Sequence, residues 1–258
     1  MRHRGFTLVE LLTVIATLSI LMALLLPSLH LARQLAYRTR CQSNQRQLAL
    51  AWRLYADDHE GRFYRGDNNY NYNFGGWQGL SDPCAVRPLN HYLSLPDPIK
   101  EPKQAKLFHC PADIGGEDYD KFKSAFDKFG NSYEANYTLI GPNPPLATWG
   151  QDAILFAKIN QSCEDLKWDN LAQPDQLVLL GDHNWPSQWD PSNRWYCGRA
   201  WHGKRHHYNL AFLDGHVDFI EIQKGLCLTE EYRIHPIVTL NNLVTSLQSR
   251  VPCVCEAP

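Results

Sequence analysis

The chain has no excess of charge of either sign: 25 Lys and Arg stand against 27 Asp and Glu in 258 residues, a net charge of −2. A nucleic-acid-binding domain usually has a strongly basic face, so the balance argues against that class and predicts no nucleic-acid partner. A mean hydropathy of −0.41 excludes a protein with many membrane spans. The apolar content of 44% and aromatic content of 12% are globular values, which exclude intrinsic disorder.

The familiar motifs of catalysis and cofactor binding are also missing. There is no nucleophile elbow, no phosphate-cradling glycine loop and no zinc-protease helix motif. The acid pairs Asp57-Asp58 and Asp118/Asp120 lie in polar stretches that are typical of a solvated surface. The sequence therefore predicts a protein that is not an enzyme, with no catalytic residue and no cofactor.

One long apolar segment stands out from this background. Residues 6–26 contain 16 apolar residues among 21. As a helix they would extend roughly 31 Å, enough to cross a hydrocarbon core of about 30 Å. Arg2 and Arg4 precede the segment, and the positive-inside rule keeps that end in the cytoplasm. We expect a single membrane span at 6–29, with the C-terminal domain outside the cytoplasm.

An acidic residue, Glu10, interrupts this apolar segment. A carboxylate in the centre of a membrane span costs on the order of 2.5–3.5 kcal/mol, and less near an end. Such a residue usually has a partner, and no Lys or Arg lies between Phe6 and His30. An ordinary signal peptide is the alternative, but its apolar core is only about 7–15 residues long and ends at small residues. The segment here is longer and lacks a good small-residue cleavage site.

Residues 4–12, Arg-Gly-Phe-Thr-Leu-Val-Glu-Leu-Leu, resemble the type III signal peptide of type IV pilins and type II secretion pseudopilins. The resemblance implies that residues 1–5 are a leader, that a prepilin peptidase cleaves after Gly5, and that Phe6 is then N-methylated. Glu10 would be the signature acid of the family, and Pro27 would occupy the place of its helix-kinking proline. The implied partners are the peptidase, other pilin or pseudopilin subunits and an inner-membrane assembly platform. The implied location is the inner membrane, with the C-terminal domain periplasmic or extracellular.

The position of Glu10 makes physical sense in such a protein. Cleavage would create an α-amino group with a pKa near 7.7–8, which is a cation in an apolar setting. The Glu10 carboxylate can neutralise the amine of its own or a neighbouring subunit. Glu10 is then costly in an isolated span and favourable in a packed filament, where it would help to set the axial register.

The helical pattern continues through residues 30–60, and we expect an amphipathic extension of the same helix. Polar residues at 57–60 and Gly61 predict its end. We expect this half to pack on a globular domain at 61–258, with a coiled coil as the alternative. The stripe that would face the domain has spacings of three and four: Leu31, Leu35, Arg38, Gln42, Gln45, Leu48, Trp52 and Tyr55.

The globular region predicts an α+β, pilin-like fold, in which the long helix packs on an antiparallel β-sheet. Residues 177–182 are typical of a buried strand. Residues 208–222 alternate apolar and polar side chains around Asp214-Gly215, which predicts a hairpin with a two-residue type I′ turn.

Four short motifs in this region resemble, in their order, a pilin-like family tagged by a processing-associated H-x9-DG motif. The spacing departs from that pattern, because eleven, seven and six residues separate His202, His206 and His207 from Asp214. Which histidine is equivalent is left open. The motifs are Phe108-His-Cys-Pro-Ala-Asp113, Ser132-Tyr133 with Asn136, Leu179-Leu-Gly-Asp182 and Phe212-Leu-Asp-Gly-His-Val217.

The chain has eight cysteines, at 41, 84, 110, 163, 197, 227, 253 and 255. An exported domain lies in an oxidising compartment, where disulfides are the default. No Cys-x-x-Cys pair is present, so a thioredoxin-like or zinc-ribbon site has little support. Eight thiols allow 105 pairings, and the sequence does not choose among them. The disulfide candidates are Cys84, Cys110, Cys163, Cys197, Cys227, Cys253 and Cys255.

Histidines and acids gather in the last third of the globular region, and imidazole and carboxylate are metal ligands. The possible metal set is His183, His202, His206, Asp214 and His216. The favoured interpretation is structural, with these side chains bonding to loop backbone around the hairpin. An exported metal-dependent hydrolase is the alternative.

Aromatic residues crowd residues 185–201: Trp185, Trp189, Trp195, Tyr196 and Trp201. Packing of a long loop by its own aromatics is the favoured interpretation. A carbohydrate-binding surface on a membrane-anchored module is the alternative.

Overall fold

A computed structural model describes residues 8–66, 74–80, 86–115, 122–142, 165–183, 185–186, 201–224 and 226–236. Its helices are α1 (Leu8–Asp58), α2 (Pro88–Tyr92) and α3 (Ala125–Phe129), with 3-10 turns η1 (Pro102–Phe108) and η2 (Trp168–Asn170). Its strands are β1 (Arg65–Gly66), β2 (Tyr133–Ala135), β3 (Gly141–Pro142), β4 (Val178–Asp182), β5 (His207–Phe212) and β6 (Val217–Glu221).

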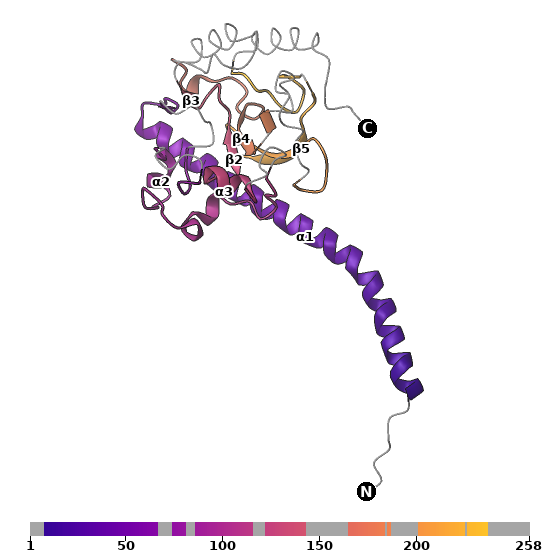
Figure 1. The fold of residues 1–258 in the computed structure, drawn as a ribbon. Coiled ribbons are helices and arrows are strands. Elements are labelled where there is room, and N and C mark those ends of the chain that lie inside the picture. The colour runs from indigo at the N-terminus through magenta and orange to yellow at the C-terminus, as the bar shows by residue number, and fades with distance from the viewer. Residues whose placement is uncertain are drawn as a thin grey trace.

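Helix α1 dominates the shape of the described chain. Its C-terminal half lies on the domain, and its N-terminal half extends far away from it along a curved path (Figure 1). Pro27 lies inside the helix, where its ring removes one backbone donor without ending the helix. The helix ends where Gly61, with a φ of 79°, donates from its N–H to the carbonyl of Ala56 over 2.7 Å.

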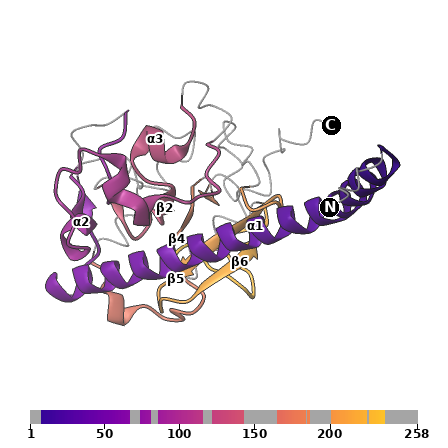
Figure 2. The same ribbon diagram turned by 90° about the horizontal axis from the view of Figure 1, so that it is seen from below.

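The main sheet has four antiparallel strands in the order β2-β4-β5-β6, which confirms the predicted α+β fold with a long helix on an antiparallel sheet. The predicted buried strand at 177–182 is β4, and all five of its residues are buried. A separate parallel pair joins β1 to β3. Figure 2 shows α1 running alongside the sheet, where it contacts β4, β5 and β6.

The predicted hairpin is present as β5 and β6, with His207 paired to Glu221 and Ala211 to Val217. The predicted type I′ turn is wrong, because that turn needs a positive φ at both central residues and Asp214 does not have one. Gly215 alone adopts a left-handed φ, of 92°, and its N–H donates to the carbonyl of Phe212 over 3.0 Å. The loop is a turn followed by a left-handed glycine, the geometry of a three-residue hairpin loop.

The core has a layer on each face of β4. Leu177 and Leu179 face the cluster shared with α1, whereas Val178 faces a second cluster with Tyr208 and Phe212. Alternate residues of a strand point to opposite faces, so a strand covered on both sides is apolar throughout. This explains why β4 has no polar position before Asp182.

The predicted helix stripe is only partly correct. Gln45, Leu48, Trp52 and Tyr55 are buried against the domain, as expected. The expectation for its first two positions is wrong, since Leu31 is 65% and Leu35 53% exposed. Cys41 is the first fully buried residue of α1, although the half-buried Gln34 and Arg38 already lie beside Gly203 and Phe219 of the domain. Apolar spacing alone could not show where burial begins.

Candidate functional site

The N-terminal half of α1 exposes an unbroken apolar surface. An 18-residue window within it has a mean hydropathy of 2.4, and none of that window is buried inside the chain, so the helix could span a membrane. Glu10 lies in its first turn. The large exposed side chains include Leu8, Val9, Leu11, Leu12, Ile20, Leu21, Met22, Leu24, Leu25, Leu26 and Leu29.

The few hydroxyl groups in this half donate to the helix itself. Thr13, Thr17, Ser19 and Ser28 each donate to a carbonyl three or four residues earlier, over 2.7 to 3.0 Å. A polar group in hydrocarbon must have its hydrogen bonds satisfied internally. These four side chains therefore suit an apolar environment despite their polarity.

The C-terminal half of α1 is fixed to the domain by polar contacts as well as apolar ones. Asn44 Nδ2 donates to the Tyr133 hydroxyl over 3.0 Å and to the His109 carbonyl over 3.2 Å. A disulfide joins Cys41 to Cys110, the residue that follows His109. The helix is thus bonded to two chain segments that lie far from it in sequence.

Asp182, at the end of β4, is the centre of a buried polar network. Its Oδ1 accepts from Gln45 Nε2 over 2.9 Å. Its Oδ2 accepts from the backbone N–H and Nδ2 of Asn209, over 2.8 and 2.9 Å. His202 Nε2 lies 3.3 Å from the same oxygen. One carboxylate therefore joins α1, β4, β5 and the loop that precedes β5.

A second carboxylate, Asp113, holds the start of α3. It accepts from the N–H groups of Gly115, Ala125 and Phe126 over 2.9 to 3.0 Å, and from the Ser132 hydroxyl over 2.7 Å. Burial raises the pKa of Asp113, and the four hydrogen bonds act in the opposite direction. The Phe108–Asp113 motif and Ser132 thus form one structural unit.

Asn136, directly after β2, also joins neighbouring segments by hydrogen bonds. Its Nδ2 donates to the carbonyls of Val178 and Ile234, over 2.7 and 2.6 Å. Its Oδ1 accepts from the N–H and hydroxyl of Thr138, over 3.0 and 2.7 Å. Ser132, Asn136 and Asp182 are thus buried motif residues whose hydrogen bonds join segments distant in sequence.

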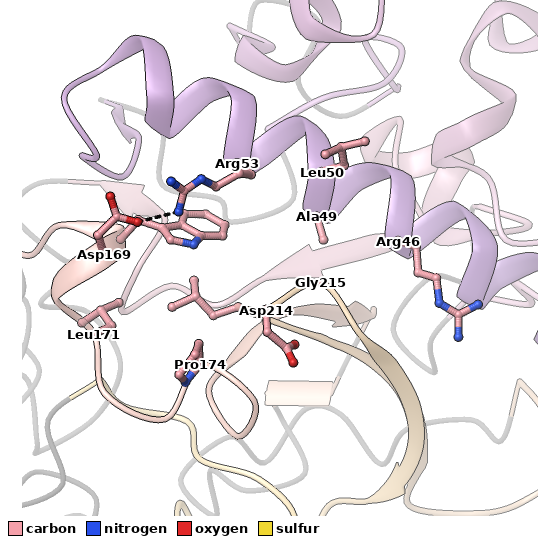
Figure 3. A pocket seen from close by; sticks show the side chains of 11 residues that line it. Arg46, Ala49, Leu50, Arg53, Asp169, Leu171, Pro174, Asp214 and Gly215 are labelled. Atoms are coloured by element: carbon pink, nitrogen blue, oxygen red, sulfur yellow. Dashed lines mark hydrogen bonds and ion pairs between the residues drawn. The ribbon is translucent and has the colours of Figure 1, made fainter.

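A cleft of about 560 Å³ opens between α1, the η2 region and the hairpin turn (Figure 3). Arg53 spans one side, donating to Asp169 over 2.6 Å, and its guanidinium lies 5.7 Å from the centre of the Trp168 ring. Asp214 and Gly215 form the opposite side. The Asp-Gly motif therefore borders the cleft.

The structure does not gather the five predicted metal ligands at one place. His183 Nδ1 lies 3.3 Å from a Glu134 carboxylate oxygen, and Asp214 and His216 pair with each other at the hairpin turn over 2.6 Å. His206 is exposed, with a φ of 61°. His202 is buried beside Asp182 and 3.7 Å from the sulfur of Cys110.

Two residues of the aromatic segment are described, and both serve the fold. Trp185 is fully buried and donates from its ring N–H to the Glu134 carbonyl over 2.9 Å. The half-buried Trp201 donates to the Gly115 carbonyl over 3.1 Å. Trp189, Trp195 and Tyr196 lie outside the described residues.

The disulfide prediction needs one correction. Cys110 is bonded as expected, but its partner is Cys41, which was not among the seven candidates. Cys227 is buried in the second core cluster. Cys84, Cys163, Cys197, Cys253 and Cys255 lie outside the described residues, as do Gly5 and Phe6.

Comparison with known proteins agrees with the helix geometry. Residues 1–26 match the family model described as the prokaryotic N-terminal methylation motif. No curated protein and no solved structure matches the chain. This motif is the N-terminal pattern of type IV pilin-like precursors, which a prepilin peptidase processes, and the long apolar helix on an antiparallel sheet is consistent with a pilin-like fold.

Proposed function

We propose that this protein is a structural subunit, a pseudopilin or minor pilin, of a type II secretion or type IV pilus-like filament. In this proposal a prepilin peptidase removes residues 1–5, methylates Phe6 and leaves the protein held in the inner membrane by residues 6–29. The domain at 61–258 would lie outside the cytoplasm. The observation that carries the proposal is the methylation motif continuing into a helix with an apolar 18-residue window, none of which is buried inside the chain.

The exposed apolar half of α1 is suited to two environments, first the lipid bilayer and then the filament. As a single span it is solvated by lipid tails, which are as apolar as its leucines. In a filament the same side chains would pack on the helices of neighbouring subunits. Glu10 favours the second environment, because a carboxylate near the end of an apolar helix gains from the new amine of a neighbouring chain.

The buried half of α1 would transmit force from the helix to the domain during assembly. A subunit drawn out of the membrane by its helix must carry its domain along. The Cys41–Cys110 disulfide and the Gln45–Asp182 hydrogen bond connect α1 covalently and through a buried carboxylate to the domain. We infer that these links keep the helix and the domain in one fixed orientation during assembly.

Mass spectrometry of the protein from its native membrane tests the proposal. We expect a mature chain that begins with N-methylated Phe6. An intact Met1 would reduce the protein to a simple anchored domain, and a cut near residues 30–36 would make the segment an ordinary signal peptide. Either result overturns the proposal.

Co-expression with a prepilin peptidase tests the cleavage position with a matched pair of variants. We expect the peptidase to process the wild-type chain and Thr7→Ser but not Gly5→Leu, because a bulky side chain at position 5 blocks cleavage of the bond that follows it. Equal processing of Gly5→Leu would contradict the assigned cleavage position.

The alternative is a membrane-anchored module that binds carbohydrate or a metal outside the cytoplasm. It predicts an unprocessed N-terminus together with glycan binding by the purified chain. The full burial of Trp185 and the hydrogen bond of the half-buried Trp201 to the Gly115 carbonyl favour the filament subunit over this alternative.

A further inference from the structure

Three metal-ligating side chains from distant parts of the chain meet beneath α1. Cys41 comes from α1, Cys110 follows η1, and His202 lies in the loop before β5. Their ligand atoms all lie within 4.8 Å of one another, and all three residues are buried. The second ring nitrogen of His202, Nδ1, is buried and has no hydrogen-bond partner in the described part of the chain.

The two sulfurs are bonded to each other in this structure, so the disulfide is the closed form of the cluster. A dithiol supplies two electrons and two protons that convert it to two thiols, and the dithiol becomes a disulfide. A phosphine supplies the two electrons and water the two protons, and the phosphine takes the water oxygen to become a phosphine oxide. Two thiolates and an imidazole are a ligand set that Zn²⁺ prefers. Tetrahedral coordination places two zinc-bound sulfurs about 3.8 Å apart, a separation that rotation of the two side chains can supply.

A buried carboxylate, Asp182, lies next to this set beside His202. Asp182 Oδ2 lies 3.3 Å from His202 Nε2, the ring nitrogen that also faces Cys110. Gln45 and Asn209 hold the carboxylate in place by hydrogen bonds. Such partners around a metal ligand fix its orientation.

Charge also favours an ion here once the disulfide is open. Two buried thiolates beside a carboxylate would be strongly unfavourable without a counter-charge. A divalent ion neutralises the two thiolates, and its binding releases the two thiol protons. The cluster therefore has a reason to take up metal only in its reduced form.

We propose that Cys41, Cys110 and His202 form a redox-gated Zn²⁺ site that is occupied when their disulfide is reduced, with Asp182 as the fourth ligand. The site goes beyond the filament role and does not depend on it. Of the five metal ligands predicted from the sequence, only His202 belongs to this site.

The test uses the full-length protein in detergent micelles, reduced with a phosphine and freed of metal with a chelator. Co²⁺ is added first, since thiolate ligands give it a charge-transfer absorption band, and Zn²⁺ is then titrated in. We expect a thiolate band for the reduced chain, its displacement by one equivalent of Zn²⁺, and no such band for the oxidised chain.

The variant His202→Asn distinguishes this site from the other cysteines that reduction exposes. It keeps both sulfurs, so the protein can fold in its oxidised form before reduction, and near-ultraviolet circular dichroism verifies that fold. We expect its Zn²⁺ affinity to fall ~10-fold or more, as expected for a disturbed ligand shell. The control His216→Asn removes a partly exposed imidazole at the hairpin turn and is expected to bind like the wild type.

Three results would overturn the proposal. The first is equal Zn²⁺ affinity of His202→Asn and the wild type, which would place the ion on other cysteines. The second is the absence of Zn²⁺ binding by the reduced wild-type chain, whether or not the chain keeps its fold after reduction. The third is an oxidised chain that binds Zn²⁺ with the same affinity and Co²⁺ with the same spectrum as the reduced one.

Discussion

Gln45 in α1 donates from its side-chain amide to the carboxylate of Asp182 in β4 over 2.9 Å, and both residues are buried. The two positions are 137 residues apart in sequence. The bond fixes the rotation of α1 about its axis relative to the sheet, because only one helix face can present Gln45 to the strand. It also supplies part of the hydrogen bonding that a buried carboxylate needs.

We predict that Asp182→Ala destabilises the domain far more than removal of an exposed acid. The variant leaves the buried donors of Gln45 and Asn209 without this acceptor, and breaking such a network costs about 3 kcal/mol. The control Asp218→Ala changes an exposed carboxylate on β6 and is expected to stay within about 0.5 kcal/mol of the wild type. Urea unfolding followed by tryptophan fluorescence measures both, and equal midpoints would contradict the role of Asp182.

The disulfide gives a second prediction, which concerns additivity. Cys41 and Cys110 are separated by 69 residues, and in the chain-entropy model closing a loop of that size stabilises the fold by about 4 kcal/mol. Cys41→Ser alone and the Cys41→Ser/Cys110→Ser pair should lose nearly the same free energy of unfolding, because either one removes the whole bond. A double variant that loses the sum of the two single losses would show that the bond is not the main contribution.

The hairpin and β4 contain glycines of two different kinds. A Cβ at Gly215 would meet nothing within 4 Å, so Gly215→Ala bears only the left-handed backbone cost of about 1 kcal/mol. A Cβ at Gly181 would lie 2.5 Å from a Leu210 methyl and 3.0 Å from the Asn209 carbonyl. Gly181→Ala should therefore cost more, about 2–3 kcal/mol. Thermal unfolding ranks the two variants, and the reverse order would contradict this packing.

Buried histidines predict a loss of stability in acid. Burial lowers the pKa of His235 to about 3, against about 6.5 in the unfolded chain. Between these values the unfolded state binds a proton that the folded state excludes, so stability falls as pH falls below about 6.5. The loss is about 1.4 kcal/mol per pH unit for one such group.

The variant His235→Asn isolates this contribution. It should flatten the dependence of the unfolding free energy on pH between about 6 and 4, whereas His91→Asn, at an exposed position, should not. Burial and the positive charge of Lys128 both lower the pKa of His183 to about 3, whereas the pKa of His235 is lowered by burial, so His235 is the simpler probe of burial. An unchanged slope in His235→Asn would contradict its neutral buried state.

Glu10 gives a prediction in which insertion and assembly move in opposite directions. Glu10→Leu removes a charge whose burial costs up to about 3 kcal/mol in a single span, so membrane retention should rise. Filament incorporation should fall, because the carboxylate that pairs with the neighbouring amine is gone. Membrane fractionation and recovery of sheared filaments measure the two effects, with Thr13→Val as the control. Normal incorporation of Glu10→Leu would contradict an assembly role.

Interactions between near neighbours in the chain could be predicted from the sequence. The apolar helix, the buried strand at 177–182 and the hairpin around residue 214 each follow from local periodicity, and the methylation motif is a short contiguous pattern. The turn type could not be predicted as surely. Asp-Gly fits more than one loop, and the stacking of His216 on Phe212, with ring centres 4.3 Å apart, accompanies the loop actually formed.

Contacts between distant segments were decided by the tertiary structure alone. The pairing of Cys41 with Cys110, the approach of His202 to both, and the hydrogen bond from Gln45 to Asp182 depend on how α1 lies on the sheet. No local pattern specifies that placement, because apolar packing fixes it through many side chains at once. Leu31 and Leu35 show the same limit. Their spacing is that of a buried stripe, but both are exposed, whereas the polar side chains of Gln34 and Arg38 lie against the domain.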